Sequence, residues 1–269
     1  MLNTINSDLY GKDKVRSVTK IKFEEDFMKK KIKFISVIFI AIVIVLMTVF
    51  LFFVNTDRYH KDETAIAAAV SDNIVTVTET DGKLIFSPQN PEYGLIFYPG
   101  GKVEYSSYSP LMHRLAAQNV LCIVTSMPFD LAVFNQNAAD GIQENYPSVK
   151  HWYIGGHSLG GVIAASYASN HTGTFDGLIL LASYSSVDIS SSGLNVISVY
   201  GSNDGVLDMK KYNESLSLLP ADTKEFVING GCHAYFGSYG TQKGDGKPTI
   251  TSAEQVQQTT EFILKNIVY

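Results

Sequence analysis

The sequence predicts an α/β protein with a mostly parallel central sheet and helices on both faces, preceded by one N-terminal transmembrane helix. After position 73, short unbroken apolar runs alternate with segments of helical spacing, which is typical of parallel strands buried on both faces. A glycine-rich turn at 155–161 joins one apolar run directly to a segment of small residues. Residues 34–54 contain no charged side chain, as expected of a membrane-crossing helix.

The uncharged segment 34–54 is expected to be a retained membrane anchor. At a rise of about 1.5 Å per residue it reaches about 31 Å as a helix, enough to cross the hydrocarbon core. A buried core helix is usually shorter, and a cleaved signal peptide has a shorter apolar region that ends in small residues. The sequence Leu51-Phe52-Phe53-Val54-Asn55 supplies no such cleavage site. Anchoring is therefore favoured over both alternatives.

The lysines around this segment predict its orientation. Four of them stand just before it: Lys29, Lys30, Lys31 and Lys33. Because positively charged flanks stay cytoplasmic, we expect residues 1–33 inside the cell, as a polar segment without a fold of its own. The large domain is then expected on the extracellular side of the plasma membrane. The sequence from Met28 resembles the start of a signal anchor, so translation from Met28 is an alternative to Met1.

The remainder is expected to form a juxtamembrane linker at 55–72 and one globular domain at 73–269. The chain is 45% hydrophobic and 17% charged, which excludes disorder for its bulk. Residues 55–269 hold twelve Lys or Arg against twenty-one Asp or Glu, and this acidic balance argues against a nucleic acid partner. The two cysteines, Cys122 and Cys232, are too few for a disulfide framework or a zinc site.

Apolar runs and helical spacing place the elements of the domain. Strands are expected at 74–80, 84–87, 95–98, 120–124, 152–154, 178–182, 196–200 and 225–228. Helices are expected at 65–71, 110–118, 132–146, 159–169 and 252–267. Asp81-Gly82 is a turn signal between the first two strands.

One turn concentrates the chemistry of the chain. Gly156-His157-Ser158-Leu159-Gly160 matches G-x-S-x-G and lies between an expected strand and an expected helix. A nucleophile on such a sharp turn has strained backbone angles, so the residues two before and two after it must be small. The helix N-terminus then directs free N–H groups at the place where negative charge develops. No Gly-Lys-Ser/Thr and no G-x-G-x-x-G is present, which removes the phosphate-binding alternatives.

A serine nucleophile needs a base, and the base needs an orienting acid. Asp204 follows the expected strand at 196–200, and His233 follows the strand at 225–228. The carboxyl ends of parallel strands share one edge of the sheet, so both residues are expected beside Ser158. Asp188, in the loop after 178–182, is an alternative acid.

No cofactor and no metal are expected. His60, His113, His151 and His171 lack metal-ligand spacing, and no H-E-x-x-H motif occurs. His157 is interpreted as a shape-filling residue of the turn. Cys232, although next to the expected base, is not at a strand-to-helix turn and is not expected to be a second nucleophile.

The motifs together resemble those of the α/β-hydrolase family. They are Phe97-Tyr98-Pro99-Gly100-Gly101, Gly156-His157-Ser158-Leu159-Gly160-Gly161, Gly201-Ser202-Asn203-Asp204-Gly205 and Gly231-Cys232-His233. The resemblance extends over about 73–268 and is strongest to small bacterial serine hydrolases related to dienelactone hydrolases and short carboxylesterases.

This resemblance implies an α/β-hydrolase fold and a Ser158–His233–Asp204 triad. It also implies an oxyanion hole made by the backbone N–H of Leu159 and by that of Gly101, with Lys102 as an alternative to Gly101. The sequence departs from the subgroup in two places. Dienelactone hydrolases use cysteine where this chain has Ser158, and Pro99 stands where many relatives have histidine.

The expected activity is transfer of an acyl group to water, with a small acyl ester as substrate. The loop between Ala182 and Gly193 is too short for a large lid, so the site is expected to be open. A peptidase or an acyltransferase with the same triad is an alternative. An exported binding module that kept the fold without the activity is another.

Overall fold

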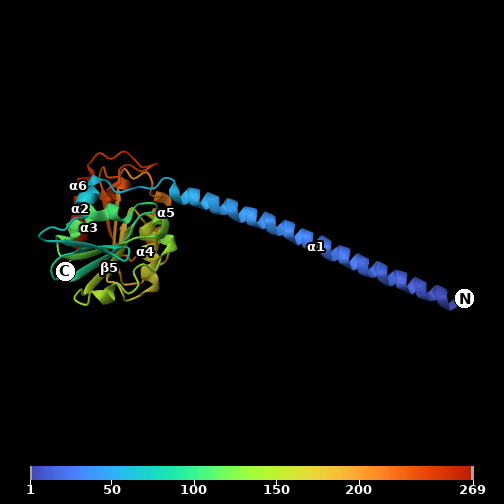
Figure 1. Ribbon diagram of the computed structural model, residues 1–269. Coiled ribbons are helices and arrows are strands. Elements are labelled where there is room, and N and C mark those ends of the chain that lie inside the picture. The colour runs from blue at the N-terminus through green and yellow to red at the C-terminus, as the bar shows by residue number, and fades with distance from the viewer. Residues whose placement is uncertain (1, 268–269) are drawn as a thin grey trace. The chain divides into compact units, whose positions relative to one another are not determined.

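A computed structural model of the chain describes residues 2–267, and it divides into two units between Thr56 and Asp57. The first unit is the single helix α1, Leu2–Asn55 (Figure 1). Its part Lys22–Asn55 is long and apolar enough to cross a membrane. The polar segment before residue 34, predicted to lack a fold of its own, continues this helix. It contains no proline, so nothing stops a helix nucleated by the apolar segment from extending through it.

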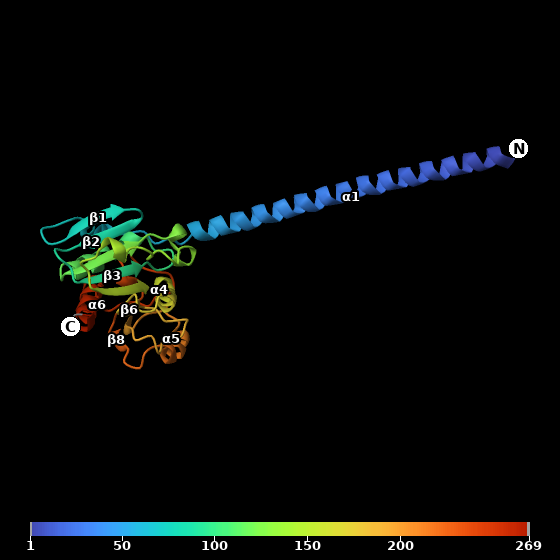
Figure 2. The ribbon, with the colours of Figure 1, turned by 90° about the horizontal axis from the view of Figure 1, so that it is seen from below.

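The second unit is built on an eight-stranded sheet (Figure 2). Its strands are β1 (Thr76–Thr80), β2 (Lys83–Ser87), β3 (Tyr93–Tyr98), β4 (Val120–Thr125), β5 (His151–His157), β6 (Gly177–Leu181), β7 (Asn195–Gly201) and β8 (Lys224–Ile228). They lie in the order β1-β2-β4-β3-β5-β6-β7-β8. β1 and β2 form an antiparallel hairpin and β2 pairs antiparallel with β4, while every pairing from β4 to β8 is parallel. The mostly parallel sheet predicted from the sequence is therefore confirmed.

Helices cover both faces of this sheet. They are α2 (Glu63–Ala68), α3 (Ser109–Ala116), α4 (Leu159–Asn170), α5 (Met209–Ser215) and α6 (Ser252–Ile267). Side chains of α3 and α6 belong to one buried cluster, and side chains of α4 belong to the cluster on the opposite face. The inner strands β3 to β7 are buried on both faces because of these helices, which explains why they read as continuous apolar runs, whereas the edge strands β1 and β8 are mostly exposed.

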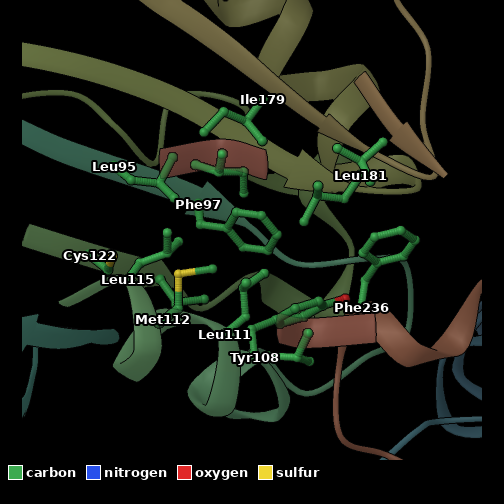
Figure 3. Packing of buried hydrophobic residues seen from close by; sticks show 14 of the residues in the cluster. Leu95, Phe97, Tyr108, Leu111, Met112, Leu115, Cys122, Ile179, Leu181 and Phe236 are labelled. Carbon is green, nitrogen blue, oxygen red and sulfur yellow. The ribbon is translucent and has the colours of Figure 1, made fainter. Parts of the chain in front are cut away.

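Aliphatic and aromatic side chains fill the space between α3 and the sheet (Figure 3). Leu111, Met112 and Leu115 of α3 are each at most 1% exposed, and they pack against the face that carries Phe97 and Cys122. Burying a side chain of this size contributes about 1.5–3 kcal/mol. The same layer includes Tyr108, whose hydroxyl reaches the functional edge of the sheet.

The prediction of a helix at 132–146 is wrong. The segment forms only the short 3₁₀ turns η3 (Ala132–Phe134) and η4 (Gln143–Asn145) with irregular chain between them. Gly141 has a φ of +68°, which is outside a right-handed helix. The hydroxyl of Tyr98 also donates to the carbonyl of Gln136 and accepts from the N–H of Ala139, so a tertiary contact replaces helical hydrogen bonds. The sequence pattern also missed the short helix α5.

Candidate active site

Ser158 occupies the sharp turn between β5 and α4. Its φ of 50° and ψ of −123° lie in a region that non-glycine residues rarely adopt, and such strain costs about 1–3 kcal/mol. Two hydrogen bonds tie it to the loop at the end of β6: the N–H of Ser158 donates to the carbonyl of Leu181 at 2.9 Å, and the hydroxyl of Ser183 donates to the carbonyl of Ser158 at 2.7 Å. Ser158 itself is only partly buried. The strained turn therefore holds its hydroxyl-bearing residue at an accessible point.

Glycines make this turn possible because neighbouring backbone passes very close to them. A Cβ on Gly156 would lie 2.5 Å from the carbonyl carbon of Gly160. A Cβ on Gly160 would in turn lie 2.2 Å from the carbonyl oxygen of Tyr98. The N-terminus of α4 thus packs directly on the end of β3, which brings the loop after β3 beside Ser158.

Two backbone N–H groups at this junction have no hydrogen-bond acceptor among the described residues, those of Gly101 and Leu159. The two residues are adjacent, because a Cβ on Gly101 would lie 3.2 Å from Cδ2 of Leu159. The neighbouring donors are occupied: Lys102 N–H donates to the carbonyl of Asp130 at 2.7 Å, and Gly100 N–H to the hydroxyl of Tyr108 at 2.8 Å. Of the two residues considered from the sequence, Gly101 rather than Lys102 retains a backbone donor without an acceptor.

The structure brings Asp204 and His233 together. Nδ1 of His233 lies 2.8 Å from Oδ2 of Asp204, and both side chains are 1% exposed. The other oxygen of Asp204 accepts the N–H groups of Val206 and Leu207, each at 2.8 Å, which fixes the plane of the carboxylate. Asp188, the alternative acid, is exposed and instead accepts hydrogen bonds from Ser190.

The second ring nitrogen of His233, Nε2, is buried and has no hydrogen-bond partner within residues 2–267. The hydroxyl of Ser158 therefore does not hydrogen-bond to it in this structure. A buried polar atom without a hydrogen-bond partner costs about 1–3 kcal/mol of stability. Nε2 of His233 is therefore available to bind a group that the described residues do not supply in this structure.

His157 connects the turn to the loop of His233. Its Nε2 lies 3.1 Å from the carbonyl oxygen of His233, and its Nδ1 lies 2.8 Å from the hydroxyl of Tyr108. In a neutral ring only one arrangement of protons fits these contacts: Nε2–H donates to the carbonyl, and Tyr108 donates to Nδ1 while accepting from Gly100. Burial, followed by the nearby His233, lowers the pKa of His157 well below its ordinary value, which keeps the ring neutral.

A profile described as "Alpha/beta hydrolase family" matches residues 94–257. The chain belongs to the alpha/beta hydrolase family. The match contains the Ser158 turn, Asp204 and His233, and it ends within α6. No curated protein matches the chain. The narrower resemblance to dienelactone hydrolases and short carboxylesterases stays a prediction.

Solved structures share the fold of this alpha/beta hydrolase. Est1E from Butyrivibrio proteoclasticus, solved with ferulic acid bound, is 14% identical with a TM-score of 0.54, covering 72% of this chain and 100% of its own. A soluble variant of monoglyceride lipase from Saccharomyces cerevisiae, in complex with a substrate analogue, is 13% identical with a TM-score of 0.52, covering 74% and 98%. At this identity the likeness establishes the fold alone.

Asp245 is a residue of this hydrolase that the sequence analysis missed. Its carboxylate accepts the N–H groups of His233 at 3.1 Å, Ala234 at 2.9 Å and Gly205 at 3.1 Å, so it ties the loop of His233 to the loop of Asp204. Although burial opposes ionisation, the hydrogen bonds from Ala234, Gly205 and His233 lower the pKa of Asp245 below its ordinary value. A Gly-Asp-Gly sequence at 244–246, soon after the expected base, was the signal that could have found it.

Neither a metal centre nor a reactive thiol accompanies this site in the described part of the chain. The described residues contain no group of three or more His, Cys, Asp or Glu side chains that could hold a metal ion. Cys122 and Cys232 are both free and buried. Burial raises the pKa of the Cys232 thiol to about 12, so it stays protonated beside His233.

Proposed function

We propose that this alpha/beta hydrolase is a membrane-anchored serine hydrolase that cleaves carboxylic esters or related acyl bonds through Ser158, His233 and Asp204. One observation carries the proposal: the buried pair of His233 and Asp204, joined at 2.8 Å, leaves Nε2 of His233 without a partner. That nitrogen is the one a general base would use, and Ser158 stands next to His157, whose ring centroid is 4.6 Å from that of His233.

In the proposed reaction His233 removes the proton of the Ser158 hydroxyl as its oxygen attacks the acyl carbonyl. The carboxylate of Asp204 orients the imidazole and stabilises its charged form. His233 then returns the proton to the leaving alcohol. In the second half of the reaction His233 removes a proton from water as the water attacks the acyl carbonyl, and it returns this proton to the oxygen of Ser158 as the acyl group leaves. Apo enzymes often lack the short serine–histidine contact, which forms when the substrate is bound.

The negative oxygen of the tetrahedral intermediate needs donors that are already in position. The backbone N–H groups of Gly101 and Leu159 are without acceptors among the described residues, and Gly101 packs against the side chain of Leu159. We assign the oxyanion hole to these two N–H groups. Removing one such donor typically costs about 10²–10³ in kcat. Leu159 directly follows Ser158, whose strained φ belongs to the same turn.

The substrate is proposed to be a small acyl ester, reached from the extracellular side of the plasma membrane. The short loop between Ala182 and Gly193 supports an open site. The apolar part of α1 and the lysines before it support an anchor whose N-terminus is cytoplasmic.

Labelling with a fluorophosphonate probe tests the proposal. Wild-type protein is expected to be labelled at Ser158 and to hydrolyse p-nitrophenyl acetate. Ser158→Ala is expected not to be labelled, and its kcat should be about 10⁴–10⁶-fold lower. Ser169→Ala, which removes a hydroxyl bonded only to the carbonyl of Ser166 within α4, is the matched control and should still be labelled. An unlabelled, folded wild-type protein would instead support a binding module without activity.

A further inference from the structure

Residues 58–61, which we call the strap, run beside the loop that follows β3. The N–H of Tyr59 donates to the carbonyl of Lys102 at 2.8 Å, and the carbonyl of Tyr59 accepts the N–H of Glu104 at 2.9 Å. These two bonds make Tyr59 and Val103 a short parallel bridge. The strap and the loop belong to the same compact unit as the proposed site. The strap is therefore bound, by its backbone, to the loop that contains a proposed oxyanion donor.

Side chains fasten the strap to two further loops. Nε of Arg58 donates to Oδ2 of Asp130 at 2.8 Å, and the side chain of Asp130 is only 12% exposed. An ion pair with a mostly buried carboxylate is screened by salt less than an exposed pair. The ring of Tyr59 packs against that of Tyr239 with centroids 5.5 Å apart, and its hydroxyl accepts the N–H of Lys243 at 3.2 Å. The strap is thus held on both sides of Tyr59.

The loop that the strap holds contains a strained four-residue turn, 100–103. The N–H of Val103 donates to the carbonyl of Gly100 at 3.2 Å, and Lys102, the third residue of the turn, has a φ of 62°. Glycine is the residue favoured where a turn needs a positive φ, because a side chain is strained there. Contacts from outside the turn offset this strain. The N–H of Lys102 donates to the carbonyl of Asp130 at 2.7 Å, and its carbonyl accepts from Tyr59.

The conformation of this turn determines where the N–H of Gly101 points. The carbonyl of Gly100 and the N–H of Gly101 belong to one trans peptide group, so they point in opposite directions. Because the carbonyl of Gly100 is directed at the N–H of Val103 inside the turn, the N–H of Gly101 is directed out of it. A rotation of this peptide group would turn the proposed donor away from the oxyanion.

We propose that the strap positions the oxyanion donor, with Arg58 and Tyr59 holding the turn 100–103 in the conformation that directs the N–H of Gly101 at the acyl oxygen of the substrate. This inference rests on the proposed serine hydrolase. Arg58 and Tyr59 act through the turn and are positioning residues. The strap precedes the residues 94–257 that the family profile matches, so this support is a feature of the present chain outside the family pattern.

Hydrogen exchange in the full-length protein tests the positioning without relying on activity. Arg58→Gly with Tyr59→Gly removes the ion pair and the ring contact, and it raises the entropic cost of ordering the strap. We expect amides within residues 100–104 to exchange about fivefold faster or more, with a smaller change in β6. Unchanged exchange at 100–104, or the same acceleration in both segments, would overturn the proposal.

A second double variant is the matched control for the strap. Glu92→Gly with Lys150→Gly removes an ion pair of 2.7 Å and also introduces two glycines. These residues precede β3 and β5, so they lie at the opposite edge of the sheet from the proposed site. Exchange within 100–104 and ester hydrolysis should both remain at the wild-type level. A loss of activity equal to that of the strap variant would overturn the proposal.

Kinetic measurements test the effect on the oxyanion. The strap variant should hydrolyse p-nitrophenyl acetate with a kcat about tenfold lower and an unchanged KM, because the displaced donor is used only in the transition state. Its Ki for a trifluoromethyl ketone, which forms a tetrahedral oxyanion on the serine, should rise by the same factor. The pKa of the base in the pH profile of kcat/KM should stay that of the wild type. Arg58→Lys with Tyr59→Phe, which keeps the charge and the ring, should recover most of the loss.

The outcomes separate this inference from the proposed function. An unchanged kcat in the folded strap variant, or a lower kcat with an unchanged Ki for the ketone, would overturn the positioning of the oxyanion donor. A wild-type protein that is neither labelled by fluorophosphonate nor active on the ester would overturn the serine hydrolase, and the role in catalysis with it. Faster exchange at 100–104 in the strap variant would in that case still show that the strap holds the turn.

Discussion

The imidazole of His157 hydrogen-bonds to the backbone of His233, with Nε2 3.1 Å from the carbonyl oxygen, while the centroids of the two rings lie 4.6 Å apart. The turn that carries Ser158 and the loop that carries His233 are therefore joined by a neutral histidine. On its other side the ring binds the hydroxyl of Tyr108, which accepts the N–H of Gly100. One buried chain of hydrogen bonds thus connects the three loops of the proposed site.

Tyr108→Phe is expected to lower both stability and activity. It leaves the N–H of Gly100 and Nδ1 of His157 without partners, which costs about 1–3 kcal/mol of unfolding free energy. Displacement of the loop after β3 should also reduce kcat about tenfold. Tyr212→Phe is the matched control, because its buried hydroxyl bonds Ser198 and Glu225 instead. Urea unfolding should show a loss of stability in both variants, and ester hydrolysis should show a lower kcat only for Tyr108→Phe. Equal kcat values in the two variants would contradict a role of Tyr108 in positioning the site.

The neutral state of His157 predicts a pH dependence of stability. Its pKa is lowered on folding, so the unfolded chain binds the proton more readily. The contribution of neutral His157 to the free energy of unfolding is fully present above the ordinary histidine pKa of about 6.5. As the pH falls from there towards the lowered pKa, this contribution decreases by up to about 1.4 kcal/mol per pH unit. Unfolding free energies measured between pH 7 and pH 5 should fall less steeply in His157→Asn. The control Ser169→Ala, which removes no titratable group, should keep the wild-type slope, and identical slopes in all three proteins would refute the assignment.

Asp245 is expected to act as a positioning residue for the base. Asp245→Ala removes the acceptor shared by His233, Ala234 and Gly205, and kcat should fall about 10–100-fold with little change in KM. Asp245→Asn, which keeps one acceptor oxygen, should recover part of the loss. Asp208→Ala removes a cap of α5 and destabilises by about 1 kcal/mol without affecting kcat. A kcat loss no larger than that of Asp208→Ala would show that Asp245 is only structural.

Gly160→Ala is expected to be far more damaging than an alanine at a surface glycine. Its methyl group would lie 2.2 Å from the carbonyl oxygen of Tyr98, a backbone atom that cannot move aside, so a cost of about 3 kcal/mol or more is expected. At Gly173 the methyl group of an alanine would have no atom within 4 Å. The only cost of Gly173→Ala is the backbone strain of a φ of +78°, about 1–2 kcal/mol. Thermal unfolding of both variants compares the two costs, and a smaller loss at Gly160 would count against the close packing of α4 on β3.

Sequence patterns correctly predicted those parts of the molecule whose structure is determined by residues close together in the sequence. The Ser158 turn needs small residues at fixed spacing, and the buried strands need apolar runs, so both are visible in the sequence. The expected helix at 132–146 failed because a hydroxyl from β3 competes for its backbone groups. Tyr108 was missed because its importance comes from contacts between distant segments, which no spacing reveals. Asp245 was missed although Gly-Asp-Gly at 244–246 marked its loop, because its hydrogen-bond partners lie in other loops. The choice of Gly101 over Lys102 also needed the partner of the Lys102 N–H, in another loop.

The burial of both sulfhydryl groups has a practical consequence for work on this protein. Cys122 and Cys232 are at most 2% exposed, and the chain contains no other cysteine. A single cysteine introduced at a surface position would therefore be the one that maleimide reagents modify in the folded protein. Spin labels and dyes can be attached at chosen positions without first replacing the natural residues.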